Sequence, residues 1–271
     1  MISGCTPAQS STTESTAPAT SLAIIAMSAN ERRQLDFDAA IAALGRWADG
    51  TEHVRFHEIT GNGRTIAIEL SLDRYEARVE GSTRRMPLNG LAAVERGADL
   101  VIGSGFVAEY APITPLGLLQ LGGTVVSDLS KHGYTRVVGA QDGALTIVGR
   151  AEYHRGLFES AVQIGPGIVE ESRLDINERE LKLPAYFRAF VASCDGAMLA
   201  GITTEPMNLY NVGSDLVAYF EQSGLRCEEV ANLSGDRETL LGVDTGDETV
   251  FIGDPNSIKA SLIGFAKRQP Q

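Results

Sequence analysis

The sequence predicts an α+β fold with one large mixed or antiparallel sheet and several packed helices. Short apolar runs recur along the chain and are separated by glycine turns, of which Gln141-Asp142-Gly143 is a hairpin signal. A few stretches instead carry apolar residues at helical spacing. With 271 residues, the chain is long enough to bury a sizeable core. Short strands mixed with a few helices favour sheets with helices packed against them.

The first expected helix begins at a capping motif. Ser28 is an N-cap candidate with Glu31 in the capping-box position, and an apolar stripe continues to Trp47. The expected helices span 28–50, 88–97 and 210–223. The expected strands are short and apolar, and span 54–59, 65–70, 75–79, 100–107, 124–126, 135–139, 144–148, 188–193, 197–202, 238–243 and 248–252.

Composition divides the chain into segments. We expect a lipoprotein-like N-terminus with a tether at 1–27, a helix at 28–50, one domain at 51–254 and a polar C-terminal tail at 255–271. Met1-Ile-Ser-Gly-Cys5 resembles the end of a bacterial lipoprotein signal, although the charged and apolar regions that precede such a cysteine are missing. Residues 6–21 are mainly Ser, Thr, Ala and Pro, which is typical of a tether. The alternative is a disordered tail with a chance cysteine.

The charge of the chain excludes some partners. A formal net charge of −12 repels phosphate backbones, so we expect no nucleic-acid partner. No apolar run approaches the roughly 20 residues of a membrane-spanning helix. The only membrane attachment that we expect is a lipid anchor at Cys5. That anchor predicts a periplasmic or other cell-envelope location. No cofactor is expected, and His53 and His57 lie too far apart along a strand to share a metal ion.

Two further cysteines leave their pairing open. Cys194 ends an expected strand and Cys227 follows the third helix. We expect two free, mostly buried thiols, because sequence cannot show that their Cα atoms lie within bridging distance. A disulfide in an oxidising compartment is the alternative.

Several short motifs come one after another in a recognisable order. They are Gln163-Ile-Gly-Pro166, Arg188 at the start of a strand, the Asp195-Gly196 hairpin, Pro206-Met-Asn208 at a helix start, and Asn232-Leu-Ser-Gly235. In this order they resemble the bacterial phosphodiester glycosidase family, relatives of the enzyme that uncovers mannose 6-phosphate by removing N-acetylglucosamine. The resemblance covers about residues 54–251 and implies a phosphodiester-glycosidase-like domain. Each motif by itself is weak.

The chain departs from the family pattern at two positions. Ser234 stands where the family has its closing aspartate, and Gly103 stands where the family has a strand-end asparagine. Serine cannot carry a negative charge at neutral pH, so it cannot replace a carboxylate. Asp236 is the expected replacement, and Glu109 and Glu238 are other acids nearby in the sequence.

The resemblance implies roles for the remaining residues. Arg188 would neutralise a phosphate, and Asp236 would act as the relocated carboxylate. The substrate-binding candidates, which offer amides, a hydroxyl or close backbone approach, are Gln163, Asn208, Asn232, Ser234, Gly103, Gly105 and Gly235. Structural alternatives remain open: Arg188 as a salt-bridge residue, Gln163 as a partner of buried backbone groups, and Asn208 as a helix N-cap.

These residues support two hypotheses for the function. The first is a phosphodiester-glycosidase-like envelope protein that acts on or binds a sugar phosphate or glycan, with lost or altered catalysis. The second is an active glycoside or phosphodiester hydrolase that uses a relocated carboxylate such as Asp236. Whether the chain is an enzyme stays open at this point. Both hypotheses require Gln163, Arg188, Asn208 and Ser234 to converge at one edge of the sheet.

Overall fold

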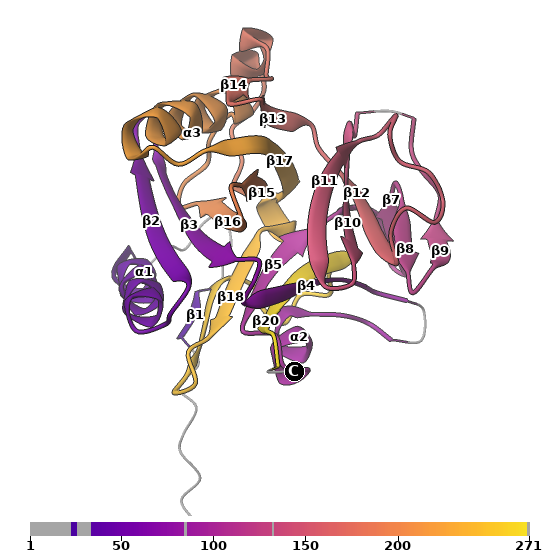
Figure 1. The fold of residues 1–271 in the computed structure, drawn as a ribbon, viewed down its shortest axis with the longest axis horizontal. Coiled ribbons are helices and arrows are strands. Elements are labelled where there is room, and N and C mark those ends of the chain that lie inside the picture. The colour runs from indigo at the N-terminus through magenta and orange to yellow at the C-terminus, as the bar shows by residue number, and fades with distance from the viewer. Residues whose placement is uncertain (1–22, 26–33, 84–85, 132, 270–271) are drawn as a thin grey trace, which may run out of the picture.

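The computed structural model describes residues 23–25, 34–83, 86–131 and 133–269. Cys5, residues 6–21 and the expected N-cap at Ser28 lie outside these residues. Within the expected N-terminal segment 1–27, Ala23–Ile25 form strand β1 and pair with Val250–Ile252. Most of the described chain forms antiparallel sheets that pack on one another (Figure 1). Every strand pair among the described residues is antiparallel except β1 with β19.

The strands form one seven-stranded, one six-stranded and one five-stranded sheet, with a two-stranded ribbon. The seven-stranded sheet has the order β14-β13-β17-β15-β16-β3-β2 and consists of Arg173–Leu174, Gly167–Glu170, Cys227–Gly235, Arg188–Cys194, Ala197–Thr203, Arg64–Ser71 and Val54–Thr60. The six-stranded sheet has the order β1-β19-β18-β5-β20-β4 and consists of Ala23–Ile25, Thr249–Gly253, Leu240–Asp244, Leu100–Ser104, Ser261–Lys267 and Tyr75–Gly81.

The five-stranded sheet and the ribbon complete the β-structure. The sheet has the order β11-β10-β12-β8-β9 and consists of Ala144–Gly149, Arg136–Gln141, Ser160–Ile164, Leu119–Leu121 and Thr124–Ser127. The ribbon pairs β6, Phe106–Tyr110, with β7, Ile113–Leu116. The expected strand at 100–107 is therefore divided, because Gly105 has a φ of 61° and turns the chain between β5 and β6.

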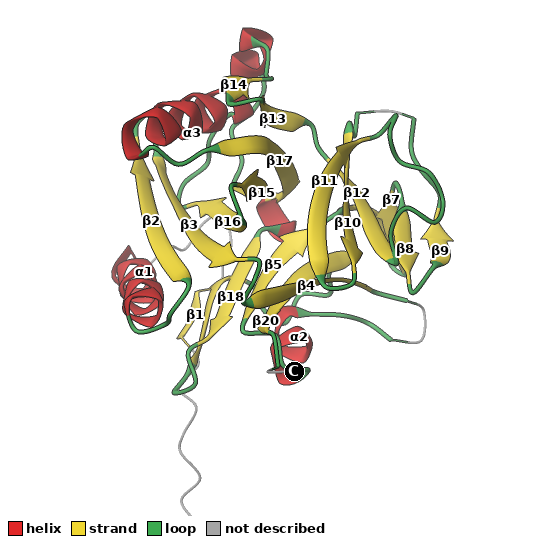
Figure 2. Cartoon of the chain, viewed as in Figure 1, coloured by secondary structure: helices red, strands yellow, loops and turns green. Residues whose placement is uncertain are grey.

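The expectation of several packed helices is wrong. The described residues contain three α-helices, α1 (Gln34–Asp49), α2 (Gly90–Glu95) and α3 (Leu209–Ser223), and two 3₁₀ turns, η1 (Glu178–Lys182) and η2 (Asp236–Glu238) (Figure 2). The large sheets bury one another instead, since Ile68, Val138 and Ile263 come from different sheets and share one core. None of the described helices is long and apolar enough to cross a membrane.

Two of the helices cover exposed parts of the sheets. Phe37, Ile41 and Leu44 form the buried stripe of α1, which packs beside β2 and β19. Helix α3 buries Leu216 and Phe220 in a second core against the seven-stranded sheet. It ends at Gly224, whose φ of 73° fits the left-handed C-cap position that favours glycine.

The expected polar tail at 255–271 is also wrong in its main part. Residues 261–267 form β20, which lies between β5 and β4 inside the six-stranded sheet. Leu262, Ile263 and Phe265 on this strand are fully buried. The short run Ser-Leu-Ile-Gly-Phe-Ala has a strand composition, but only the partners on both sides make it a central strand.

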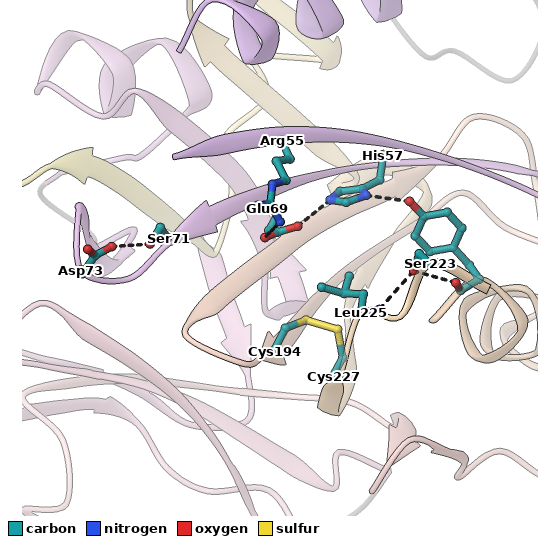
Figure 3. Close-up of polar contacts among 10 residues, drawn as sticks. Arg55, His57, Glu69, Ser71, Asp73, Cys194, Ser223, Leu225 and Cys227 are labelled. Carbon is teal, nitrogen blue, oxygen red and sulfur yellow. Dashed lines mark hydrogen bonds and ion pairs between the residues drawn. A yellow bond between two sulfur atoms is a disulfide. The ribbon is translucent and has the colours of Figure 1, made fainter. Parts of the chain in front are cut away.

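Cys194 and Cys227 form a disulfide, so the expectation of free thiols is wrong. Cys194 ends β15, Cys227 begins β17, and the two residues are paired in the register of the antiparallel strands. Figure 3 shows the bond below His57 and Glu69. The Nε2 of His57 contacts Glu69 at 2.8 Å, and its Nδ1 contacts the Tyr219 hydroxyl at 2.7 Å. The sequence could not reveal the pairing because 33 positions separate the cysteines.

Removing the disulfide is expected to destabilise the protein. In the unfolded chain the bond closes a loop across a sequence separation of 33 residues. Loss of that constraint costs about 2–4 kcal/mol. We expect the free energy of unfolding of the Cys194→Ser, Cys227→Ser double variant to fall by that amount. Denaturant unfolding followed by circular dichroism measures it as a lower midpoint concentration. The exposed-site variant Ser223→Ala is the control, and equal midpoints for the double variant and the wild type would contradict the prediction.

Candidate functional site

The start of β15 and the turn η2 are joined directly. Arg188, the first residue of β15, is paired with Gly235, the last residue of β17. The backbone N–H of Asp236 donates to the carbonyl oxygen of Phe187 at 2.9 Å, and the Thr239 hydroxyl donates to the same oxygen at 3.3 Å. Arg188 and the residues after Gly235 therefore occupy one place in the fold.

Arg188 has the properties of an anion-binding residue. Its side chain is half-buried, and burial lowers the pKa of its guanidinium. Its Nε donates to the carbonyl oxygen of Met207 at 3.5 Å, and the guanidinium carbon lies 5.0 Å from the centre of the Tyr186 ring. Among the described residues no carboxylate lies within ion-pair distance of it. A desolvated arginine without a counter-ion favours an anionic ligand.

Asp236 acts electrostatically on both Arg188 and Tyr110. The residue is exposed and has a φ of 52°, a conformation that is uncommon outside glycine and that is enriched at functional sites. Its negative charge opposes the effect of burial on the pKa of Arg188. Burial raises the pKa of Tyr110, and the charges of Glu238 and Asp236 raise it further. The carboxylate is thus within electrostatic reach of both side chains.

Glu238 supplies a second carboxyl group in a different environment. It is only 4% exposed, and burial raises the pKa of its carboxyl. The Tyr110 hydroxyl donates to its Oε1 at 3.1 Å, while its buried Oε2 has no hydrogen-bond partner among the described residues. Two neighbouring carboxyls, one exposed and one buried, are the kind of pair that separates the roles of base and acid.

A buried lysine fixes the turn that carries these carboxyls. Lys259 is fully buried, and its Nζ donates to the carbonyl oxygen of Arg237 at 2.7 Å. Burial lowers the pKa of Lys259, and the charge of Glu238 opposes that shift. On the surface, the guanidinium of Arg237 lies 4.7 Å from the centre of the Tyr110 ring. Lys259 thus supports η2 from the inside and Tyr110 flanks it from the outside.

The structure brings together part of the set expected from the sequence. Arg188, Gly235 and Asp236 are neighbours, and we call these three with Glu238 and Tyr110 the Arg188 site. Asn208 follows Met207 and so lies near Arg188. It occupies the N-cap position of α3 but makes no side-chain capping bond, and its buried Oδ1 has no partner among the described residues. That oxygen is therefore an unsatisfied buried acceptor close to Arg188.

Ser234 belongs to the interior. It is fully buried, and its hydroxyl contacts the carbonyl oxygens of Gly103 and Glu238 at 3.4 and 3.3 Å. Side chains alternate along a strand, so Ser234 faces away from the side on which Gly235 meets Arg188. In this arrangement the Ser234 hydroxyl ties η2 to β5, and its expected contact with substrate has no support in the geometry.

The two glycines at Gly103 and Gly105 are needed for packing. A Cβ at Gly103 would lie 2.2 Å from the carbonyl oxygen of Glu238, so there is no room for the asparagine of the family pattern. A Cβ at Gly105 would lie 2.3 Å from the Ser261 hydroxyl. The sequence suggested that Gly103 and Gly105 let the backbone approach a ligand closely. Close packing inside the protein accounts for both glycines instead.

Gln163 and Asn232 lie around the Gly165-Pro166 segment instead. The Gln163 amide is fully buried, with its oxygen accepting from the N–H groups of Leu118 and Ser130 and its nitrogen donating to the carbonyls of Ser130 and Tyr134. All hydrogen-bonding positions of the Gln163 amide are occupied. Gln163 is therefore a partner of buried backbone groups, which was the structural alternative to substrate binding. Asn232 donates to the Gly165 carbonyl at 3.1 Å, and its buried Oδ1 has no partner among the described residues.

Sequence reasoning did not identify Tyr110, Tyr186 or Lys259. The exposed tyrosines lie in ordinary-looking loop sequence, and nothing in their spacing connects them with Arg188. Lys259 comes shortly after an Asp-Pro-Asn turn and resembles a surface residue in sequence, because lysine is almost never fully buried. In the described part of the chain no three His, Cys, Asp or Glu side chains are placed to hold a metal ion.

Comparison with solved structures shows what the fold is similar to. The catalytic domain of zebrafish N-acetylglucosamine-1-phosphodiester alpha-N-acetylglucosaminidase, auto-inhibited by its pro-peptide, matches with a TM-score of 0.59 and 12% identity over 79% of this chain and 82% of that one. A hypothetical protein from Synechocystis matches with a TM-score of 0.56 and 12% identity over 80% and 63%. A putative exported protein from Burkholderia pseudomallei has a TM-score of 0.49 and 9% identity over 86% and 81%.

The sequence by itself finds no such match. No protein-family model matches the chain, and no curated protein does. At 12% identity the likeness shows a fold similar to that of the zebrafish domain, made mostly of antiparallel sheets with few helices. A phosphodiester-glycosidase-like fold is therefore plausible on the structure as well as on the sequence motifs.

Proposed function

We propose that the protein binds a sugar phosphate or a related glycan at the Arg188 site, as a phosphodiester-glycosidase-like protein with lost or altered catalysis. One observation carries this proposal: a half-buried arginine without a carboxylate partner among the described residues lies next to an exposed aspartate in a left-handed conformation. The fold shared with the zebrafish phosphodiester glycosidase domain supports it. The cell-envelope location and the lipid anchor at Cys5 belong to the same proposal and rest on the Met1–Cys5 motif.

The ligand class is inferred from the groups around Arg188. A guanidinium can neutralise a phosphate through two parallel hydrogen bonds. Tyr110 contacts Glu238 of η2 and Tyr186 lies beside Arg188; both are exposed aromatic rings, and such rings pack against the apolar face of a sugar. The exposed Asp236 carboxylate can accept hydrogen bonds from sugar hydroxyls. This one region therefore offers groups that can bind the phosphate and groups that can bind the sugar.

Altered catalysis is inferred from the position of Ser234. The family pattern places its aspartate there, but the Ser234 hydroxyl is buried and contacts backbone carbonyls. No carboxylate can occupy this position without displacing those contacts. The protein therefore lacks the acid of the family pattern at its expected place.

A second candidate function is hydrolysis of a glycosyl phosphodiester by relocated acids. It is favoured by the contrast between buried Glu238, whose pKa burial raises, and exposed Asp236 two residues away. Glu238 would protonate the leaving oxygen, and Asp236 would act on the opposite side of the sugar. This candidate uses the same Arg188 for the phosphate, so it differs from the first only in the chemical step after binding.

Arg188→Gln is expected to weaken the binding of N-acetylglucosamine 1-phosphate by about 10- to 100-fold. A hydrogen bond to a charged group contributes about 1.5–3 kcal/mol, and 1.4 kcal/mol corresponds to a tenfold change in Kd. Isothermal titration calorimetry measures the change directly. Arg55→Gln is the control, because Arg55 is exposed and pairs with Glu69 on β3. Absence of binding by the wild type, or equal affinity in the Arg188 variant, would refute the proposal.

A further inference from the structure

A cavity of about 360 Å³ lies at the end of α1, away from the Arg188 site. One wall is formed by the last turn of α1 and the residues that come after it, with Arg46, Trp47 and Thr51. The other wall is the turn between β18 and β19, with Thr245, Asp247 and Glu248. We call it the Trp47 cavity. Strand β18 begins just after η2 and ends just before this turn, so the cavity and the Arg188 site lie at opposite ends of β18.

Two charged side chains at the cavity have no partner in the part of the chain that the structure describes. The side chains of Arg46 and Asp247 are exposed, and neither forms a hydrogen bond or ion pair with another described residue. They present a guanidinium with several donors and a carboxylate with several acceptors. Opposite charges that line one cavity without pairing leave both groups available to a ligand with neighbouring hydroxyls.

The walls themselves are held in place by local hydrogen bonds. The Thr51 hydroxyl donates to the Trp47 carbonyl at 2.6 Å, and the Thr245 hydroxyl donates to the Glu248 carbonyl at 2.8 Å. Trp47 is half-buried, packs against the main core and is one of the residues that line the cavity. The indole is thus fixed from behind, and ligand sites commonly combine such a rigid aromatic wall with a few convergent polar groups.

We propose that the Trp47 cavity binds a pyranose ring of a neutral glycan. A pyranose has an apolar C–H face, which fits an indole, and pairs of adjacent hydroxyls, which can donate to Asp247 and accept from Arg46. The cavity volume is within the lower part of the range typical of small-molecule sites. The site is independent of the proposed sugar-phosphate function, since it shares no residue with the Arg188 site.

The chain offers a direct probe, because Trp47 is its single tryptophan. Titration of the full chain with N-acetylglucosamine and with N,N′-diacetylchitobiose is expected to change the tryptophan fluorescence saturably, with a Kd of about 1 mM. Asp247→Asn and Arg46→Gln are each expected to weaken this binding by about tenfold, the equivalent of one lost hydrogen bond to a charged group. Arg173→Gln serves as the matched control and is expected to titrate like the wild type, because Arg173 is exposed on β14, at the edge of the seven-stranded sheet opposite β2.

The outcomes separate this inference from the proposed function. A saturable signal that survives Arg173→Gln and is weakened by the two cavity variants supports the inference, whether or not the Arg188 site binds sugar phosphate. No saturable change with either sugar up to about 100 mM, far above the expected Kd, overturns it. A change reproduced by glycerol at equal concentration, or undiminished in both cavity variants, overturns it as well.

Discussion

Gly103→Asn is expected to lower the stability of the protein by about 3 kcal/mol or more, although asparagine is the residue of the family pattern at this position. A Cβ at residue 103 would lie 2.2 Å from the carbonyl oxygen of Glu238 and 3.3 Å from the backbone nitrogen of Leu240. Backbone atoms on a neighbouring segment cannot rotate away as a side-chain end can. β5 would have to separate from β18, which is also its hydrogen-bonded neighbour.

Thermal unfolding measures this effect, and Gly103→Ala tests it without adding a polar group. A loss of about 3 kcal/mol corresponds to a fall in Tm of roughly 5 °C for a chain of this size. Gly264→Ala is the matched control, since Gly264 lies on the adjacent strand β20 and its Cβ would meet other atoms only at 3.4 Å or more. A Gly103→Ala variant as stable as the Gly264→Ala variant would show that the sheet accommodates a side chain here.

Glu238→Gln is expected to reduce any hydrolysis of an α-N-acetylglucosaminyl phosphodiester by about 10²- to 10⁴-fold, the usual contribution of a general acid–base group. Burial raises the pKa of Glu238, so its carboxyl stays protonated to a higher pH than an exposed glutamate. Activity that requires the acid should therefore fall as the pH rises through this elevated pKa. The Glu238→Gln variant should have a low rate, and that rate should no longer fall with rising pH through the pKa of Glu238.

The assay distinguishes the two candidate functions. Glu109→Gln is the matched control, because Glu109 is an exposed acid on β6, the strand that also carries Tyr110. Hydrolysis by the wild type that is lost in Glu238→Gln and kept in Glu109→Gln supports the relocated-acid hydrolase. Binding of N-acetylglucosamine 1-phosphate without hydrolysis supports the binding protein with lost catalysis. Hydrolysis that is equal in both variants would show that Glu238 is not the acid.

The order of the motifs was readable because each is local. Arg188 begins a strand, Asp195-Gly196 makes a turn, and α3 starts just after Asn208, all of which depend on residues close in sequence. The pairing of Arg188 with Gly235 agrees with the expectation that these motifs converge. Gln163 did not join them, since its amide is consumed by backbone groups of Leu118, Ser130 and Tyr134 that the sequence does not connect with it.

The sequence by itself determined many of the short strands, the turns between them and the position of α3, because apolar periodicity and turn residues act over a few residues. Only the tertiary structure decided that 261–267 is a central strand, that Cys194 meets Cys227, and that Ser234 faces the interior. The reason is physical: strand partners are chosen by contacts between distant segments, and a shift of one residue along a strand moves a side chain to the other face. Whether a carboxyl is exposed like Asp236 or buried like Glu238 depends on those partners, and so does its chemistry.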